Sequence, residues 1–83
     1  MKPDIALTKH LLAILNRIGP AGVEEGALMV ELEVAAGRPL TTQAAKDCIL
    51  QAKDKGWTGS RRDDWDQTRW WITEAGKTML SGM

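Results

Sequence analysis

The sequence predicts a mainly α domain with a small β-hairpin (α+β): a three-helix core, then the hairpin, then a short C-terminal helix. Two observations support this order. Apolar residues recur with helical periodicity in three segments, and a glycine follows each of them. All four tryptophans lie in a later segment, residues 57–71, in a chain without Phe or Tyr. Part of that segment alternates apolar and polar residues as a β-strand does. We therefore expect a single domain over residues 1–83.

The first helix is expected over about residues 5–18, with Asp4 as its cap and Gly19-Pro20 as its end. Its apolar stripe consists of Leu7, Leu11, Ile14, Leu15 and Ile18. His10 lies near the edge of this stripe. We interpret it as a partly buried histidine rather than as a ligand or a base.

The second helix is expected over residues 23–36. Glu24 and Glu25 fall in its first turn, where the helix dipole favours carboxylates. The predicted buried stripe, widened by its two valines, consists of Leu28, Met29, Leu32, Ala36, Val30 and Val34. Gly37 supplies the left-handed residue that ends the helix.

A third helix follows over residues 42–55, capped by Thr41 or Thr42. Its inward face is made of small residues and one isoleucine, namely Ala45, Cys48, Ile49 and Ala52. Small side chains let a helix pack closely against its neighbours. We therefore expect Cys48 to be a core residue and not a reactive thiol.

The hairpin is expected to have strands at 57–62 and 68–73 around a polar turn at 63–67. Alternation places Trp70 and Ile72 on the buried face, where Trp57 adds further bulk, and Trp71 on the outer face. Trp65 falls at the tip of the turn. Exposed tryptophans are enriched where proteins meet partners, so Trp65 and Trp71 are protein-interaction candidates, and Trp71 should contribute little to stability.

Thr73 is expected to cap the short last helix, which runs to about Leu80. Met79 and Leu80 are predicted to reach back to the core.

The formal net charge is zero, although the charges are unevenly distributed. Residues 1–22 carry +2, residues 23–37 carry −4, residues 38–57 carry +2, and the remainder balances. A dedicated nucleic-acid binder usually has a basic surplus, so this balance counts against one.

One cysteine and one histidine leave little for a disulfide framework or a metal site. We expect no cofactor, no membrane contact and no small-molecule ligand. The absence of a signal peptide and of a long apolar run favours a soluble, cytoplasmic protein. No pairing of a nucleophile with a base is visible, so an enzyme is the poorest of the three functional hypotheses.

Two strings in the chain resemble a known fold. ILQAKDKGW, residues 49–57, resembles the close of the recognition helix in MarR-like regulators, with Ala52 where a leucine is usual. DDWDQTRWWITEAG, residues 63–76, resembles their wing, with Asp66 and Arg69 three residues apart, then Ile72, Thr73 and Gly76. The resemblance covers about residues 5–80 and implies a winged helix-turn-helix domain. Similar strings also occur in small uncharacterised bacterial and phage proteins.

In such domains the third helix enters the major groove of DNA and the wing follows the backbone or the minor groove. Carried over by position, the resemblance implies that the groove-facing residues are Thr42, Gln43, Lys46, Asp47 and Leu50. It makes Arg38, Arg61, Arg62 and Arg69 candidates for phosphate contacts. Gln43 could read adenine, and Lys46 could read guanine or a phosphate.

Several acidic residues depart from this pattern, because a carboxylate that faces DNA opposes binding. Asp47 lies on the reading face, and Asp63, Asp64 and Asp66 cluster at the wing. The wing aspartates have an alternative explanation as turn formers, with Asp66 paired to Arg62 or Arg69.

Two functional hypotheses remain open. The first is a small regulator that binds double-stranded DNA without an effector domain, as a homodimer. The second is a winged helix that serves as a protein-interaction or assembly module and does not bind DNA.

Overall fold

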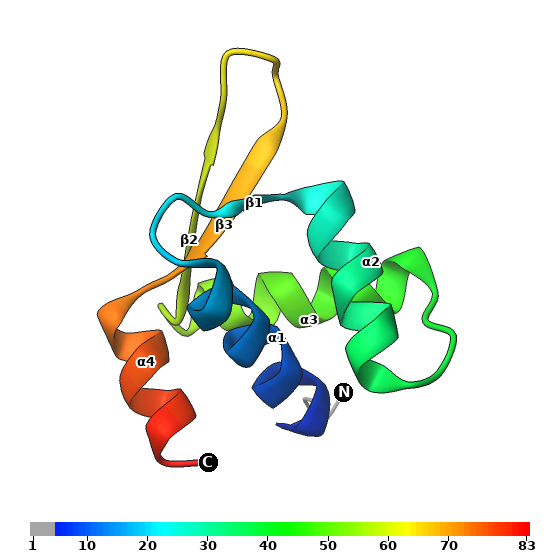
Figure 1. Ribbon diagram of the computed structural model, residues 1–83, viewed down its shortest axis with the longest axis vertical. Coiled ribbons are helices and arrows are strands. Elements are labelled where there is room, and N and C mark those ends of the chain that lie inside the picture. Colours follow the sequence, from blue (N-terminus) through cyan, green and yellow to red (C-terminus); the bar gives the residue numbers. More distant parts are fainter. Residues whose placement is uncertain (1–4) are drawn as a thin grey trace.

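The structure is a computed structural model that describes residues 5–83, so the predicted cap at Asp4 lies outside the described residues. The elements are α1 (Ile5–Ile18), β1 (Val23–Glu24), α2 (Glu25–Ala36), α3 (Thr42–Asp54), β2 (Thr58–Arg62), β3 (Thr68–Ile72) and α4 (Glu74–Ser81). The helices gather into one body, and the β2–β3 hairpin projects beyond it (Figure 1). The predicted order of three helices, a hairpin and a short helix is confirmed.

A short strand before α2 corrects the predicted start of the second helix. Val23 pairs with Trp70 and Glu24 with Arg69, so the hairpin becomes an antiparallel sheet of three strands in the order β1-β3-β2. Gly22 makes this approach possible, because a Cβ at that position would lie 2.5 Å from the Trp70 carbonyl oxygen. A strand of two residues has no alternating pattern, so the sequence could not predict it.

The predicted end of α2 and the predicted caps of α3 and α4 are confirmed. The Thr41 hydroxyl accepts a hydrogen bond from the Ala44 amide at 3.0 Å and begins α3. Gly37 ends α2 in the left-handed conformation, with φ of 69°. The Thr73 hydroxyl begins α4 by accepting from the Gly76 amide at 3.1 Å, and it also donates to the Gly56 carbonyl at 2.6 Å.

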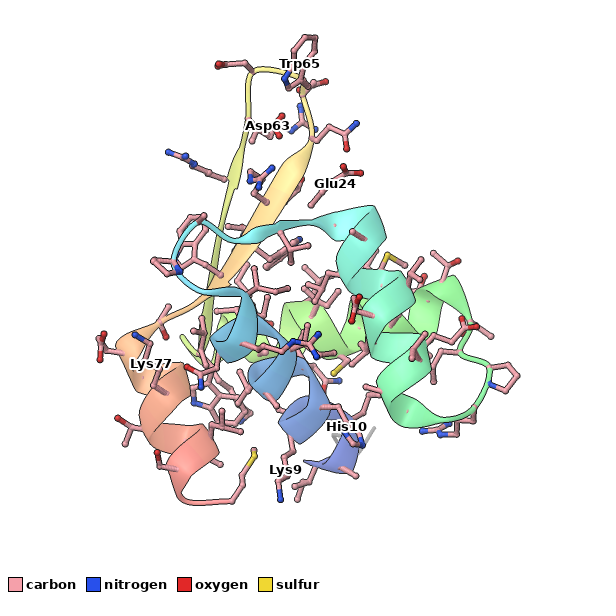
Figure 2. The ribbon with its side chains drawn as sticks, in the orientation of Figure 1. Lys9, His10, Glu24, Asp63, Trp65 and Lys77 are labelled. Atoms are coloured by element: carbon pink, nitrogen blue, oxygen red, sulfur yellow. The ribbon has the colours of Figure 1, made fainter. Side chains whose placement is uncertain are left out.

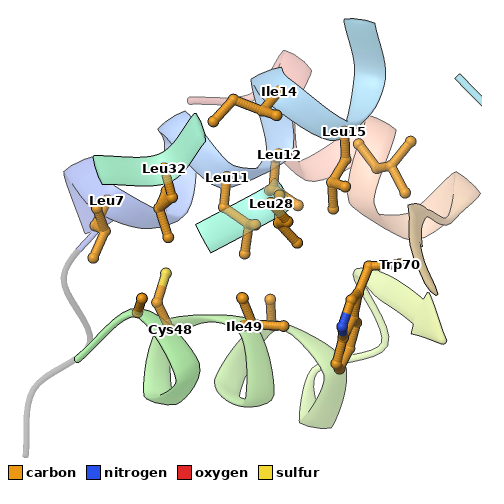
Figure 3. Close-up of a cluster of buried hydrophobic side chains, with 13 residues drawn as sticks. Leu7, Leu11, Leu12, Ile14, Leu15, Leu28, Leu32, Cys48, Ile49 and Trp70 are labelled. Atoms are coloured by element: carbon orange, nitrogen blue, oxygen red, sulfur yellow. The ribbon is translucent and has the colours of Figure 1, made fainter. Parts of the chain in front are cut away.

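The core lies between α1, α2, α3 and the inner face of the sheet (Figure 3). Its buried apolar residues are Leu7, Leu11, Leu12, Ile14, Leu15, Leu28, Leu32, Ala45, Cys48, Ile49, Ala52, Trp70 and Ile72. The predicted inward face of α3 is confirmed in full. Leu12 was not predicted, because α1 is covered by α2, α3, α4 and β3 and so buries a wider face than a single stripe.

Three expectations about buried side chains are wrong. Val30 and Val34 are 65% and 74% exposed, because α2 meets the body mainly along the side that carries Leu28 and Leu32. His10 is exposed on α1 and not partly buried. Met79 is also exposed, whereas Leu80 packs against the core as predicted.

Trp70 and Ile72 are buried on the inner face of the sheet, which confirms the predicted strand register. Trp70 is 2% exposed. Its indole Nε1 donates to Glu25 Oε1 at 3.3 Å, and Lys53 Nζ lies 5.8 Å from the centre of its ring. Trp57 is partly buried against the same core.

Trp71 lies on the outer face, but the expectation that it is exposed is wrong. Its neighbour across the sheet is Gly59. A Cβ on Gly59 would lie 2.6 Å from the Trp71 indole, so the ring covers β2 and is half-buried. Strand alternation gives the face of a residue, but it does not show that a glycine opposite makes room for a ring.

Trp70→Ala should lower the free energy of unfolding by about 3–5 kcal/mol, because the substitution empties a large part of a small core. Trp65→Ala should change it by less than about 0.5 kcal/mol, since that indole is 84% exposed. Urea denaturation followed by circular dichroism measures both values. Equal losses in the two variants would contradict the assigned burial.

Candidate nucleic-acid interface

The solvent side of α3 carries the residues predicted to face DNA. Because Ala45, Cys48, Ile49 and Ala52 turn toward the core, the opposite side of the helix is left to solvent. Thr42, Gln43, Lys46 and Leu50 are exposed there, and Asp47 beside them is half-buried. The structure thus brings the predicted reading residues together on one face.

Two of these residues bond to each other. Gln43 Nε2 donates to Asp47 Oδ1 at 2.7 Å, one helical turn further along α3. Lys46 lies between them in sequence and makes no hydrogen bond or ion pair with residues 5–83. The face therefore offers an uncompensated ammonium group next to an amide–carboxylate pair.

Arg38 is exposed on the turn that joins α2 to α3. It lies close in sequence to the N-terminus of α3, the helix that the resemblance implies would face DNA.

The turn of the hairpin, which we call the wing tip (residues 63–67), is organised by Asp63. Its Oδ1 accepts from the amides of Trp65 at 2.9 Å and Gln67 at 3.0 Å. Asp66 adopts a left-handed conformation, with φ of 60°, which Asp tolerates better than most residues. Asp63 is thus a turn former, as the alternative explanation of the acidic wing proposed.

The three arginines of the hairpin differ in their exposure and in their hydrogen-bond partners. Arg62 Nη1 donates to Asp66 Oδ1 at 2.8 Å, which confirms one of the two predicted pairings, and its side chain is 72% exposed. Arg69 is 37% exposed, lies 3.9 Å from Asp63 Oδ2 and donates to the Gly22 carbonyl at 3.5 Å. Arg69 therefore joins the wing to the segment before β1, and its side chain is less exposed than that of Arg62.

Arg61 stands directly across from Arg69 on the outer face of the sheet and is exposed. It has no ion pair within residues 5–83. By the alternation of β2, Arg62 lies on the opposite face, which is the face that carries Trp70 and meets the helices. The outer face of the hairpin therefore carries Arg61 and Arg69, and the opposite face carries Arg62.

The two protein-interaction candidates also differ. Trp65 stands at the wing tip and points away from the body (Figure 2). Trp71 borders a shallow hollow with Pro20, Ala21 and Arg61 and contributes to packing. Of the two indoles, only that of Trp65 is exposed as predicted.

The acidic residues at the start of α2 are partly structural. Glu25 holds the indole of Trp70, and Glu31 pairs with Arg17 at 3.1 Å. Glu24 lies on β1, beside the hairpin (Figure 2). The sequence pattern indicated only a solvated acidic face, since the partner of Glu25 lies 45 positions further along the chain.

Two general features of residues 5–83 bear on function. They contain no group of three His, Cys, Asp or Glu side chains that could hold a metal ion. None of their helices is long and apolar enough to cross a membrane.

Asp63→Ala should loosen the wing tip, because it removes the acceptor shared by two backbone amides and costs about 1–2 kcal/mol locally. Amide hydrogen exchange at Trp65 and Gln67 should become roughly tenfold faster or more. Asp64→Ala is the matched control, since that carboxylate is exposed and makes no hydrogen bond with residues 5–83. Equal exchange rates in both variants would show that Asp63 does not hold the turn.

Three solved structures are similar to this arrangement. A transcriptional regulator of the MarR family from Silicibacter pomeroyi gives a TM-score of 0.76 at 18% identity, over 93% of this chain and 47% of its own. F-93 of SSV1 gives 0.75 at 21% identity, over 98% of this chain and 84% of its own. A point mutant of MepR from S. aureus gives 0.68 at 17% identity, over 90% of this chain and 51% of its own.

The chain thus spans about half the length of the MarR-family regulator and of MepR. No protein-family model matches the sequence, and no curated protein matches it. All three structures are winged helix-turn-helix proteins. At these identities the likeness concerns the fold, and the chain has the winged helix-turn-helix fold.

Proposed function

We propose that the protein binds double-stranded DNA as a small transcriptional regulator, with α3 in the major groove and the hairpin against the phosphate backbone. The observation that carries this proposal is the solvent face of α3, where Thr42, Gln43 and Lys46 stand together. They are the side-chain types that hydrogen-bond to base edges and phosphates. In the winged-helix fold this helix is the one that enters the groove.

The proposed phosphate contacts come from Arg38, Arg61 and Arg62. Arg61 is exposed and can contact a phosphate without breaking an ion pair within residues 5–83. Arg62 must share its guanidinium between Asp66 and a phosphate, and the pair is exposed enough for water and salt to weaken it. Arg69 is left out of the contact set because its bonds are internal.

A protein with zero net charge should bind DNA of arbitrary sequence weakly. Counterion release scales with the number of phosphates neutralised, and each carboxylate near the backbone reduces it. Most of the affinity for the target sequence should therefore come from contacts with bases and from the binding of two subunits at once.

A second candidate function is that of a protein-interaction module, and Trp65 is the observation that favours it. An indole that is 84% exposed on a projecting hairpin is a suitable anchor for a partner. Salt separates the two functions: phosphate contacts weaken as salt rises, whereas an aromatic anchor is much less affected.

Fluorescence anisotropy with mixed-sequence duplex DNA at about 50 and about 200 mM salt tests the DNA proposal. Arg61→Ala should weaken binding and lower the slope of log affinity against log salt by about 1, as expected for one lost phosphate contact. Lys9→Ala is the matched control, because it removes the same charge from the end of the body away from the hairpin (Figure 2). Equal effects of both variants would mean that only net charge matters, and absence of binding at low salt would sink the proposal.

We infer that the regulator is a homodimer, since one module of this size buries little surface on DNA by itself. Ile5, Met79 and Met83, near the two ends of the described chain, border one cavity together with Trp57, and Ile5 is 68% exposed. These residues are the proposed contact between the two copies.

Ile5→Glu should shift the protein from dimer to monomer, because it places a charge in this contact. The substitution should not harm folding, since a carboxylate is favourable in the first turn of α1. Sedimentation velocity measures the mass of the species. Val30→Glu, which alters an exposed valine on α2, is the control, and dissociation by that variant alone would place the contact elsewhere.

A further inference from the structure

The carboxylate of Asp47 on the reading face of α3 is paired with an amide and not with a cation. Gln43 Nε2 donates to Asp47 Oδ1 at 2.7 Å, and the two residues lie on the side of the helix away from the core. Lys46 is next to Asp47 in sequence but does not bond to it. A residue that opposes DNA binding by its charge is thus bonded to the residue best suited to read a base.

This bond favours one orientation of the Gln43 amide. An ionised carboxylate only accepts hydrogen bonds, so it holds the amide nitrogen and leaves the amide oxygen pointing elsewhere. One N–H of Gln43 is used by Asp47. When Asp47 takes the N–H that points away from the amide oxygen, the second N–H and the oxygen remain available side by side.

That remaining pair of groups complements one base. In the major groove adenine presents an amino donor beside the N7 acceptor, which matches an amide oxygen beside an N–H. Guanine presents two acceptors, O6 and N7, and a carboxylate close to them repels both. The unused oxygen of Asp47 also favours a base that carries an amino group.

We propose that Asp47 is a positioning residue that sets the base preference of α3: it holds Gln43 for adenine and disfavours guanine at the same position. This inference rests on the proposed DNA-binding function and adds the source of its specificity. A Gln side chain held before binding also loses less conformational freedom in the complex. The carboxylate lowers affinity for DNA in general, and it raises the difference between the correct and the incorrect sequence.

The experiment is a selection from a randomised duplex library at low salt, followed by sequencing, with the wild-type protein and three variants. Gln43→Ala identifies the base position that Gln43 faces, because the preference there should disappear. Asp47→Asn keeps the size of the side chain, but an Asn can either donate to or accept from Gln43, so the amide is no longer fixed. Asp54→Asn is the matched control: it removes an exposed carboxylate two turns further along the same helix, away from Gln43.

The wild type should prefer adenine over guanine by roughly tenfold or more at the position that Gln43 faces. Asp47→Asn should remove most of this preference, while Asp54→Asn should retain it. Both Asn variants should bind mixed-sequence DNA more tightly than the wild type, since each loses a negative charge. Thermal melting should show that both remain folded.

An adenine preference that survives in Asp47→Asn would overturn the role of Asp47 and leave DNA binding intact. A wild-type preference for guanine at that position would overturn it as well. If the wild type retains no duplex even at about 50 mM salt, the proposed function fails and this inference fails with it. Anisotropy with mixed-sequence DNA separates that outcome from the other two.

Discussion

The structure depends on the position of Trp70. Its main chain pairs with Val23 on one side and Ser60 on the other, so it holds all three strands together. Its ring closes the core between the sheet and the end of α3, and its indole N–H is satisfied by Glu25 at the start of α2 (Figure 3). A buried donor without a partner would cost free energy, so this bond fixes where α2 begins relative to the sheet. One side chain thus relates the helix-turn-helix unit to the wing.

Most of the fold could be predicted because its determinants are local. Helical periodicity, the caps at Thr41 and Thr73, the glycine at 37 and the alternation around Trp70 all act within a few residues. The parts that could not be predicted depend on contacts between distant segments. Strand β1 exists because Trp70 is there to pair with it, and Trp71 is half-buried because Gly59 lies opposite. The exposure of Val30 and Val34 reflects an apolar side of α2 that nothing in residues 5–83 covers.

The positions of the candidate residues on the fold could be predicted, but their hydrogen bonds and ion pairs could not. The resemblance implied that Thr42, Gln43 and Lys46 share one face, and the structure has all three exposed on the solvent side of α3. The resemblance could not show which polar groups are already used. Arg69 contacts Asp63 and the Gly22 carbonyl. Arg62 is paired with Asp66, and Gln43 is bonded to Asp47. These pairings reduce the number of polar groups that are available to a ligand.

The short strand β1 has a mechanical consequence. A two-stranded hairpin that is joined to the body at one end only could change its angle relative to the helices. Here Glu24 pairs with Arg69, and the Arg69 side chain donates to the Gly22 carbonyl. The part of the hairpin nearest the helices is therefore bonded to the segment that leads into α2. The spacing between α3 and the arginines of the wing is therefore fixed in advance. On the proposed function, a duplex whose groove width matches this spacing would bind without distortion, whereas any other duplex would have to deform at a cost in free energy.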